Sequence, residues 1–244
     1  MTPLLHTRAL AVPGRLAPVD LRIEPGEFVG LIGPNGAGKT TLIRAALGLI
    51  RAEGGSSITD MPLARRPRHL AYLAQDRQLA WPIAVRDLVA LGARANPDLR
   101  DDGMACADRV LARLGLQDLA HRAVDSLSGG ERARVLMGRA LAQQAPLLVA
   151  DEPCAALDPA HSLGMARLMA DHARAGGAVL ASLHDLPIAA RFCTRVLVMR
   201  RGQLLADGPP DRVLSPGLMA DVFAIAFRRH QLDGDVAWSV GGLD

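Results

Sequence analysis

Apolar residues recur with two different periods along this chain. Residues 28–32 form a nearly continuous apolar run after a Pro-Gly turn, a pattern typical of a strand that is buried on both faces. Other short apolar runs predict further strands at 69–75, 147–151 and 178–185, and a hairpin at 195–208. The helical period predicts helices at 39–50, 84–92, 107–116 and 131–144. Strands that alternate with helices predict an α/β fold with a mainly parallel sheet.

Composition narrows the possible functions. The chain has 244 residues, of which 50% are hydrophobic, so it can bury a sizeable core. The net charge is +3, but acidic and basic residues are interspersed and only 3% of the residues are aromatic, so we expect no nucleic-acid partner. No apolar run approaches the ~18 residues of a membrane span, and we expect the chain itself to be soluble. The cysteines, an odd number at wide spacings, indicate reduced thiols.

The segment GPNGAGKT, residues 33–40, lies between a predicted strand and a predicted helix. It matches the pattern G-x-x-x-x-G-K-[ST], and the strand-to-helix context supports the match. Gly36 and Gly38 allow the loop to curl, so that backbone N–H groups point inward at phosphate oxygens. The helix that starts near Gly38 adds the dipole of its N-terminus, and Thr40 offers a hydroxyl to Mg²⁺. We call residues 33–40 the phosphate loop.

Lys39 is the only lysine of the chain. Every other residue in the combined count of lysine and arginine is an arginine. A compact ammonium fits inside a tight phosphate loop, whereas a planar guanidinium is wider and its donors diverge. Lys39 is therefore predicted to contact the β- and γ-phosphates of a nucleotide. The alternative, a glycine-rich turn with an incidental lysine, is disfavoured because pattern and context agree.

Two adjacent acids, Asp151 and Glu152, end the predicted strand in LLVADEP. Asp151 is predicted to hold Mg²⁺, as an acid on a neighbouring strand does in P-loop enzymes. Glu152 lies one residue further on, where it can orient and deprotonate an attacking water. Solvated acids at a strand end are the alternative, but the phosphate loop favours the catalytic interpretation.

The segment LSGGERARVLM, residues 127–137, contains Ser128 and Glu131 at the spacing of a capping box, which predicts a helix N-terminus. A cap does not require Gly129 and Gly130, which weaken the first helical turn by ~1 kcal/mol each. Bare glycines expose backbone N–H groups to a bulky anion. The segment therefore predicts a second phosphate-binding helix start, far from the first in sequence.

In this order, the phosphate loop, LSGGE and LLVADEP resemble the motifs of the ABC ATPases, and the resemblance covers nearly the whole chain. Gln75 matches the Q-loop glutamine, Asp158 in AALD matches the D-loop acid, and His184 matches the switch histidine. The resemblance implies a P-loop NTPase fold with a RecA-like core, an N-terminal antiparallel β segment and an inserted α-helical subdomain. The core lobe would comprise about 1–80 and 140–244, and the helical subdomain about 81–139.

The resemblance also implies that the chain binds ATP with Mg²⁺ and hydrolyses it. The implied catalytic residues are Glu152, His184 and Lys39. The implied nucleotide-binding residues are Gly33, Pro34, Asn35, Gly36, Ala37, Gly38, Lys39, Thr40, Thr41, Gln75, Ser128, Gly129, Gly130 and Asp158. The implied Mg²⁺ ligands are Thr40, Gln75 and Asp151. Taken singly, Gln75 is equally consistent with a surface strand end, and His184 with a structural histidine.

Two copies of such an ATPase pair head to tail about a two-fold axis, for which one chain suffices. Ser128, Gly129 and Gly130 of one copy would bind the γ-phosphate of the partner's ATP, and hydrolysis would open the dimer. Family members often stack adenine on an aromatic residue about 27 positions before the lysine. Here that position is Val12, and no aromatic residue precedes Phe28, so adenine recognition departs from the family pattern.

Residues 75–97 and 213–240 resemble ATPases of the iron–siderophore, haem and cobalamin importer class, in which a short helix and strand close the chain. This resemblance implies integral-membrane permease subunits, indirectly a periplasmic substrate-binding protein, and a location at the cytoplasmic face of the inner membrane. The alternative is an ABC ATPase of another transporter class, whereas the presence of both Glu152 and His184 argues against a regulatory module without hydrolysis. DNA-repair ATPases carry a long coiled coil and translation factors usually carry two cassettes, and neither feature occurs here.

Overall fold

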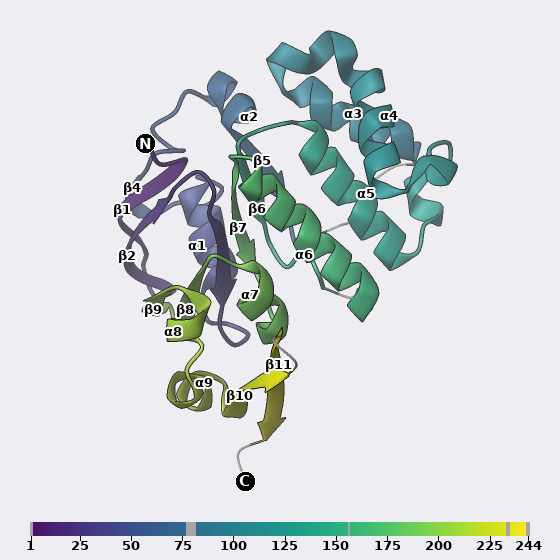
Figure 1. The fold of residues 1–244 in the computed structure, drawn as a ribbon. Coiled ribbons are helices and arrows are strands. Elements are labelled where there is room, and N and C mark those ends of the chain that lie inside the picture. Colours follow the sequence, from purple (N-terminus) through teal and green to yellow (C-terminus); the bar gives the residue numbers. More distant parts are fainter. Residues whose placement is uncertain (1, 77–81, 156, 233–234, 243–244) are drawn as a thin grey trace. The chain divides into compact units, whose positions relative to one another are not determined.

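The computed structural model describes residues 2–76, 82–155, 157–232 and 235–242, and the chain divides into two compact units (Figure 1). Unit 1 contains Met1–Asp60 and Leu180–Asp244, and unit 2 contains Met61–Val179. The segment expected to form the helical subdomain, about 81–139, therefore belongs to unit 2. Residues 77–81, part of the segment that resembles importer ATPases, lie outside the described residues.

Unit 1 begins with a three-stranded antiparallel sheet in the order β2-β1-β4. Its strands are β1 (Leu5–Val12), β2 (Leu16–Ile23) and β4 (Glu53–Ser56). Residues of β2 alternate between buried and exposed, as expected of a sheet with one covered face. Strand β1 packs against helix α1 (Lys39–Ala46), and Figure 1 shows these purple strands beside that helix.

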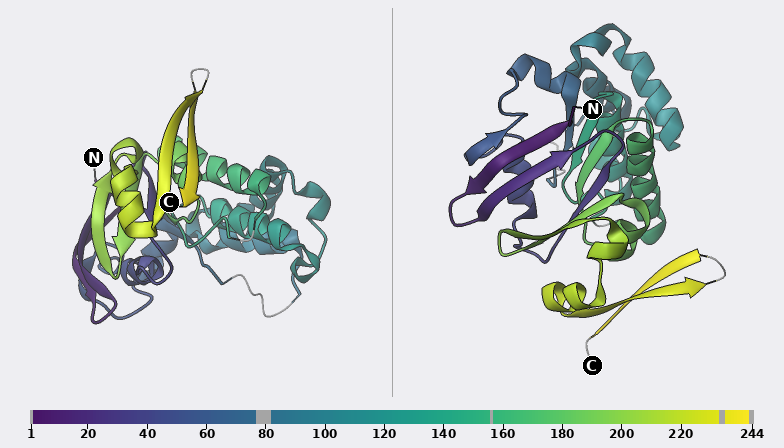
Figure 2. Two further views of the ribbon diagram at one scale, coloured as in Figure 1. Left: turned by 90° about the horizontal axis from the view of Figure 1, so that it is seen from below. Right: turned by 60° about the vertical axis from the view of Figure 1, so that its left-hand side comes forward.

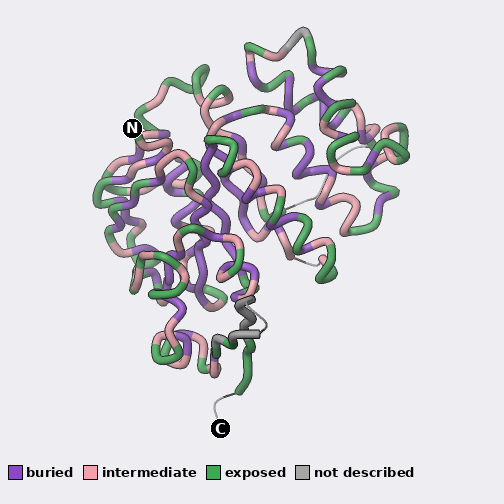
Figure 3. Tube along the Cα trace, viewed as in Figure 1, coloured by how far each residue is buried: buried purple, intermediate pink, exposed green. Residues whose placement is uncertain are grey.

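The strands that carry the phosphate loop belong to a second, deeply buried sheet. In unit 1, β3 (Phe28–Ile32) pairs in parallel with β8 (Arg195–Arg200), with Val29 opposite Arg195. Strand β9 (Gln203–Gly208) pairs antiparallel with β8, which confirms the predicted hairpin. Strand β7 (Ala178–Ser182) carries the chain from unit 2 into unit 1, and both β3 and β7 are buried at every residue (Figure 3).

The rest of unit 1 is mostly helical. It contains α7 (Leu186–Phe192), α8 (Pro210–Val213) and α9 (Pro216–Phe223). Helix α1 ends at Ala46 instead of near residue 50, because Gly48 adopts a left-handed conformation with φ 70°. The chain closes with two strands where one was expected: β10 (Ile225–Leu232) and β11 (Asp235–Gly242) form the antiparallel ribbon of Figure 2.

Unit 2 combines two parallel strands with most of the helices. Strand β5 (Leu70–Leu73) pairs with β6 (Leu147–Ala150), with Leu70 opposite Leu147. The helices are α2 (Arg66–His69), α3 (Val85–Ala95), α4 (Gly103–Leu114), α5 (Gly129–Ala142) and α6 (Pro159–Arg174). Short 3₁₀ turns occupy Leu63–Arg65, Pro97–Asp102, Gln117–Leu119 and Val124–Ser126. The helices predicted at 84–92 and 107–116 are confirmed as α3 and α4, whereas α6 was not predicted.

Helices α3, α4 and α5 pack against one another within unit 2. The backbones of α3 and α5 approach so closely that a Cβ atom on Gly92 would lie 1.9 Å from the carbonyl oxygen of Arg139. Only glycine permits this crossing. Among the described residues, no helix is both long and apolar enough to cross a membrane.

Candidate functional site

The phosphate loop follows the buried strand β3 and leads directly into α1. Its lysine turns back into the loop: Nζ of Lys39 donates to the carbonyl oxygens of Gly33 at 2.8 Å and Pro34 at 3.2 Å. The Lys39 side chain is buried, with 5% of its surface exposed. An ammonium enclosed by backbone in this way marks the centre of the curled loop, where the sequence places the phosphates.

Two glycines give the loop its curvature. Gly38 is the N-cap of α1 with φ 103°, and Gly36 has φ 75°, conformations that other residues adopt only with strain. A Cβ atom on Gly36 would meet nothing within 4 Å, so packing does not require glycine at this position. The curvature leaves open space that a phosphate group can enter.

The other residues of the loop fix its walls. The backbone N–H of Ala37 donates to the carbonyl oxygen of Pro34 at 3.1 Å, and the Ala37 carbonyl accepts from Gly202 at 2.9 Å. Asn35 is exposed, and Thr40 lies half-buried in the first turn of α1, followed by the half-buried Thr41. The loop is thereby attached to the β8–β9 turn, which contains Gly202.

His184 lies two residues after β7. The N–H of Leu183 donates to the carbonyl oxygen of Leu31 on β3 at 3.0 Å, so the chain leaves β7 beside the strand that feeds the phosphate loop. The strand ends at Ser182 and not at 185, because Asp185 caps α7 by accepting from the N–H of Ile188 at 2.8 Å. His184 is exposed, which disfavours the alternative of a buried structural histidine.

Gln75 and Asp151 follow the carboxyl ends of two neighbouring parallel strands in unit 2. The N–H of Asp151 donates to the carbonyl oxygen of Leu73 at 2.9 Å, which continues the β5–β6 pairing by one residue. The Asp151 side chain is fully buried, whereas Gln75 is exposed. This edge of the sheet is where ligand-binding residues gather in open α/β folds.

Glu152 has a strained backbone, with φ 51° in the left-handed region that residues other than glycine rarely adopt. Strain of this kind costs about 1–3 kcal/mol and clusters at functional sites. Its carbonyl oxygen accepts from the N–H of Ala155 at 3.1 Å, and the buried Pro153 follows it. The strained turn sets the direction of the Glu152 side chain at the strand tip.

The capping box at the start of α5 is confirmed. Ser128 Oγ accepts from the N–H of Glu131 at 3.3 Å, and Glu131 Oε2 accepts from the N–H of Ser128 at 2.9 Å. The backbone hydrogen bond from Ser128, followed by that from its hydroxyl, holds the pKa of Glu131 below its usual range. The cap therefore stabilises the N-terminus of α5, where Gly129 and Gly130 form the first turn.

The two glycines that follow Ser128 have room around them. A Cβ atom on Gly129 would meet nothing within 4 Å, and one on Gly130 would meet only Cδ2 of Leu157, at 3.7 Å. Packing alone therefore does not require either glycine. Leu157 belongs to the D-loop segment 155–158, of which residue 156 lies outside the described residues, so this segment lies beside the glycines within unit 2.

Asp158 has an established structural role as the N-cap of α6, where Oδ1 accepts from the N–H of His161 at 2.9 Å. This backbone hydrogen bond, followed by the one from the imidazole of His161, lowers the pKa of Asp158. The D-loop acid thus fixes the start of a helix that the sequence analysis did not predict. Its nucleotide-binding role remains a prediction.

The turn between β1 and β2 contains a residue that the sequence analysis did not single out. The carbonyl oxygen of Arg15 would lie 3.4 Å from a Cβ atom on Gly38, so this turn packs directly on the N-terminus of α1. The Arg15 side chain is exposed, and Val12, at the position of the family's aromatic residue, is half-buried three residues before it. In the sequence, Arg15 is distinguished only as an arginine close to Val12, within residues 8–15.

A buried strand, a glycine loop that encloses its lysine, and a helix define the P-loop class of nucleotide-binding proteins. The family model described as ABC transporter matches residues 16–155, which is more than half of the chain. The chain therefore belongs to the ABC transporter family, as an ATPase subunit that binds ATP.

Curated relatives agree with this assignment. The chain is 41% identical over 214 residues to the hemin import ATP-binding protein HmuV of Streptomyces coelicolor, covering 84% of this chain and 76% of that protein. It is 44% identical over 218 residues to HmuV of Nocardia farcinica, covering 84% and 74%. It is 39% identical over 214 residues to the cobalamin import ATP-binding protein BtuD of Halobacterium salinarum, covering 84% and 54%.

Solved structures confirm the fold. An ABC transporter assigned to the metal-chelate type, in an inward-facing conformation, has a chain that matches with a TM-score of 0.85 at 22% identity, covering 98% of this chain and 97% of that one. The ATP-binding subunit of another ABC transporter matches with a TM-score of 0.74 at 28% identity, covering 88% and 93%. The predicted P-loop NTPase fold with its N-terminal antiparallel segment is thus correct.

Proposed function

We propose that this chain supplies ATP hydrolysis to an importer of haem, iron–siderophore complexes or cobalamin. Its similarity to ATP-binding proteins of hemin and cobalamin import, over more than four fifths of its length, is the observation that carries the proposal. An importer of another class is the alternative, because the catalytic motifs are common to the whole family.

In this proposal, the side chains and the backbone of the phosphate loop bind the triphosphate of ATP. Lys39 exchanges its hydrogen bonds with Gly33 and Pro34 for the β- and γ-phosphates, which fill the space beside Gly36. Backbone N–H groups of the loop donate to the phosphate oxygens, and the half-buried Thr41 adds its hydroxyl. Charge-assisted hydrogen bonds of this kind are roughly twice as strong as neutral ones, so the loop holds the triphosphate more than the base.

The residues proposed as Mg²⁺ ligands offer the hard oxygen donors that this cation prefers. They are the hydroxyl of Thr40, the amide of Gln75 and the carboxylate of Asp151, whose burial favours a bound cation over exposure to water. When bound, Mg²⁺ neutralises charge that develops on the phosphate oxygens. The donor set therefore fits the cation.

The hydrolysis step is assigned to two residues at strand ends. Glu152 accepts a proton from the water that attacks the γ-phosphorus, and its strained backbone holds the carboxylate in place. His184, whose side chain is exposed, donates a hydrogen bond to the γ-phosphate. Asp158 holds the D-loop against the start of α6.

The signature glycines are proposed to act on a second copy of the chain. Ser128, Gly129 and Gly130 would contact the γ-phosphate bound to the partner copy in a head-to-tail dimer, and the room that a Cβ atom would find at Gly129 suits this contact. We assign about 1–80 and 140–244 to the core lobe and about 81–139 to the helical subdomain of each copy.

A groove within unit 2 is proposed as the permease contact. It has a volume of about 490 Å³ and lies between the end of β5 and helix α5. Tyr72 and Asp76 line one side, Leu136 and Arg139 the other, and Gln75 lies between the first two along the chain. A permease segment in this groove would connect transport to Gln75, and would place the ATPase at the cytoplasmic face of the inner membrane. A periplasmic substrate-binding protein would deliver the cargo to the permease.

Reconstitution tests the proposal. The chain is co-expressed with candidate permease subunits of the haem, siderophore or cobalamin importer class, purified as a complex and placed in proteoliposomes with a substrate-binding protein of the same class. ATP-dependent uptake of haem, cobalamin and a ferric siderophore is then measured. Uptake of one of the three, absent with Glu152→Gln, supports the proposal. ATPase activity that none of the three cargoes stimulates contradicts the cargo class but leaves the ATPase assignment intact.

A further inference from the structure

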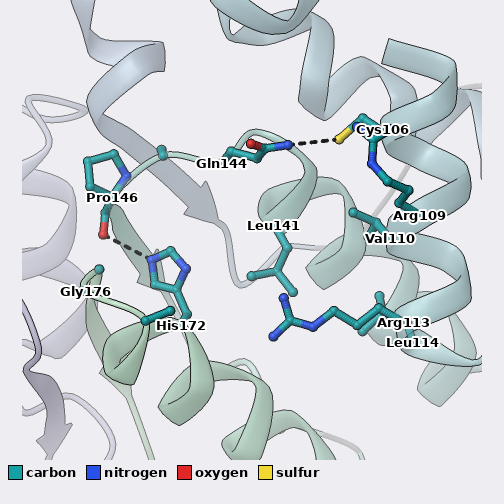
Figure 4. A pocket seen from close by; sticks show the side chains of 13 residues that line it. Cys106, Arg109, Val110, Arg113, Leu114, Leu141, Gln144, Pro146, His172 and Gly176 are labelled. Carbon is teal, nitrogen blue, oxygen red and sulfur yellow. Dashed lines mark hydrogen bonds between the residues drawn. The ribbon is translucent and has the colours of Figure 1, made fainter. Parts of the chain in front are cut away.

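A pocket of about 600 Å³ lies within unit 2 and contains none of the residues assigned to ATP, Mg²⁺ or the permease (Figure 4). One wall is a face of α4, and the other walls are the segments that lead from α5 to β6 and from α6 to β7. Small-molecule sites in proteins typically have volumes of about 300–1,000 Å³. The pocket is therefore large enough for a small organic ligand. We call it the α4 pocket.

Much of the lining is apolar. Val110 and Leu114 lie one turn apart on α4, and Leu141 and Pro146 face them from the α5–β6 segment. These side chains offer a ligand an apolar surface, which favours an organic body over an inorganic ion. Phosphate alone would leave this surface unused.

One cation in the lining has no neutralising partner. Arg113 makes no hydrogen bond or ion pair with any other described residue, and Figure 4 shows its guanidinium reaching from α4 across the pocket toward α6. Arg109, one turn earlier, already pairs with Asp102 at 2.5 Å. No aspartate or glutamate is among the residues that line the pocket. A guanidinium in this setting selects an anionic group.

The wall formed by the end of α6 contains a histidine, His172. His172 lies with Nε2 3.1 Å from the carbonyl oxygen of Pro146. Burial, the largest effect, lowers the pKa of His172; the hydrogen bond with Pro146 opposes this shift, and the charge of Arg113 adds a smaller lowering. Arg113 on α4 and His172 on α6 both line the pocket (Figure 4).

A polar residue, Gln144, also lines the pocket. Gln144 has φ 51°, and its side-chain amide donates to Sγ of Cys106 on α4 at 3.5 Å. This left-handed conformation ends α5, because Gln144 is the first residue after the C-cap, Gln143. The Gln144 side chain thus links the end of α5 to α4 at the wall of the pocket.

We propose that the α4 pocket binds a small organic anion, whose carboxylate, sulfonate or phosphate group pairs with Arg113 and whose apolar body packs on Val110, Leu114 and Leu141. The proposal is independent of the transported cargo and of the nucleotide site. It rests on the volume of the pocket, on its apolar lining and on a cation that the rest of the described chain leaves unneutralised.

Fluorescence titration with 1-anilinonaphthalene-8-sulfonate, an aromatic sulfonate, tests the proposal on the purified chain. Two variants change the pocket: Arg113→Gln removes its charge, and Ala175→Phe fills it from an exposed position in the lining. Arg174→Gln is the matched control, because Arg174 is an exposed arginine that pairs with Asp171 and does not line the pocket. Circular dichroism verifies that each variant is folded.

We expect Arg113→Gln and Ala175→Phe each to weaken binding by about tenfold or more, and Arg174→Gln to leave it within about twofold. Octanoate should displace the probe, whereas octylamine, of the same length and opposite charge, should not. Saturating ATP with Mg²⁺ should have no effect. Wild-type affinity in either pocket variant, equal displacement by octylamine, or displacement by ATP would each overturn the proposal.

Discussion

Nζ of Lys39 lies 2.8 Å from the carbonyl oxygen of Gly33, six residues earlier at the other end of the phosphate loop. The single lysine of the chain therefore holds the loop closed from inside. A residue that bridges both ends of a loop this short must be compact at its tip.

Lys39→Arg should abolish ATP turnover although it preserves the charge. The wider guanidinium cannot enter the loop and donate to Gly33 and the phosphates together. Steady-state ATPase assays on the purified variant measure the loss. Arg44→Lys, an exposed exchange on the same helix, is the control and should retain activity. If Lys39→Arg turns ATP over within about threefold of the wild-type rate, the activation free energy has changed by less than ~1 kcal/mol. That result contradicts the role assigned to Lys39.

Glu152→Gln should bind ATP, fail to hydrolyse it and accumulate as a dimer. The amide keeps the shape of the side chain but cannot accept the proton of the attacking water. Gel filtration with and without ATP detects the dimer, and Glu53→Gln, at an exposed position on β4, is the control. If Glu152→Gln hydrolyses ATP at the normal rate, another group is the base.

Nucleotide selectivity should be weak for the base and strong for the triphosphate. Val12 offers no aromatic face, and stacking adds about 0.5–1.5 kcal/mol beyond area burial, which is up to about tenfold in affinity. GTP should therefore compete nearly as well as ATP, and Val12→Tyr should tighten ATP binding. Dissociation constants for both nucleotides provide the measurement.

The alternative is that Arg15, in the turn that packs on Gly38, stacks on the base by its guanidinium plane. In that case the wild type prefers ATP more than a hundredfold and Val12→Tyr changes nothing. Arg15→Ala would then lose the preference, whereas Arg22→Ala, an exposed arginine on β2, would keep it.

Gly92→Ala should destabilise the protein by about 2 kcal/mol or more. Its Cβ atom would lie 1.9 Å from the Arg139 carbonyl oxygen, so α3 and α5 would have to separate, and overpacking of this kind costs about 1–3 kcal/mol. Gly164→Ala is the matched control, since Gly164 lies inside α6 with nothing within 4 Å of a Cβ atom. There alanine should stabilise by up to about 1 kcal/mol.

Urea denaturation of both variants gives the free energies of unfolding. Equal effects of the two exchanges would show that helix propensity, and not the α3–α5 contact, governs both positions. The comparison is direct because each glycine lies within a helix and the two differ in what surrounds them.

The sequence by itself predicted those parts of the site whose residues lie close together along the chain. A phosphate loop is a continuous segment between a strand and a helix, so the positions of Gly36, Gly38 and Lys39 follow from their order along the chain. The capping box at Ser128 is equally local, since its two partners are three residues apart. Buried strands such as β3 were recognised because both faces must be apolar.

Only the tertiary structure decided the features that depend on residues far apart. No pattern along the chain indicated that Gly92 lies against Arg139, that Arg15 packs on Gly38, or that Glu152 has a left-handed backbone. The α4 pocket brings Arg113 and His172 together from helices separated by the whole of α5 and β6. The physical reason is that periodicity reports which face of an element is buried, whereas the partner of that face is fixed by packing between elements.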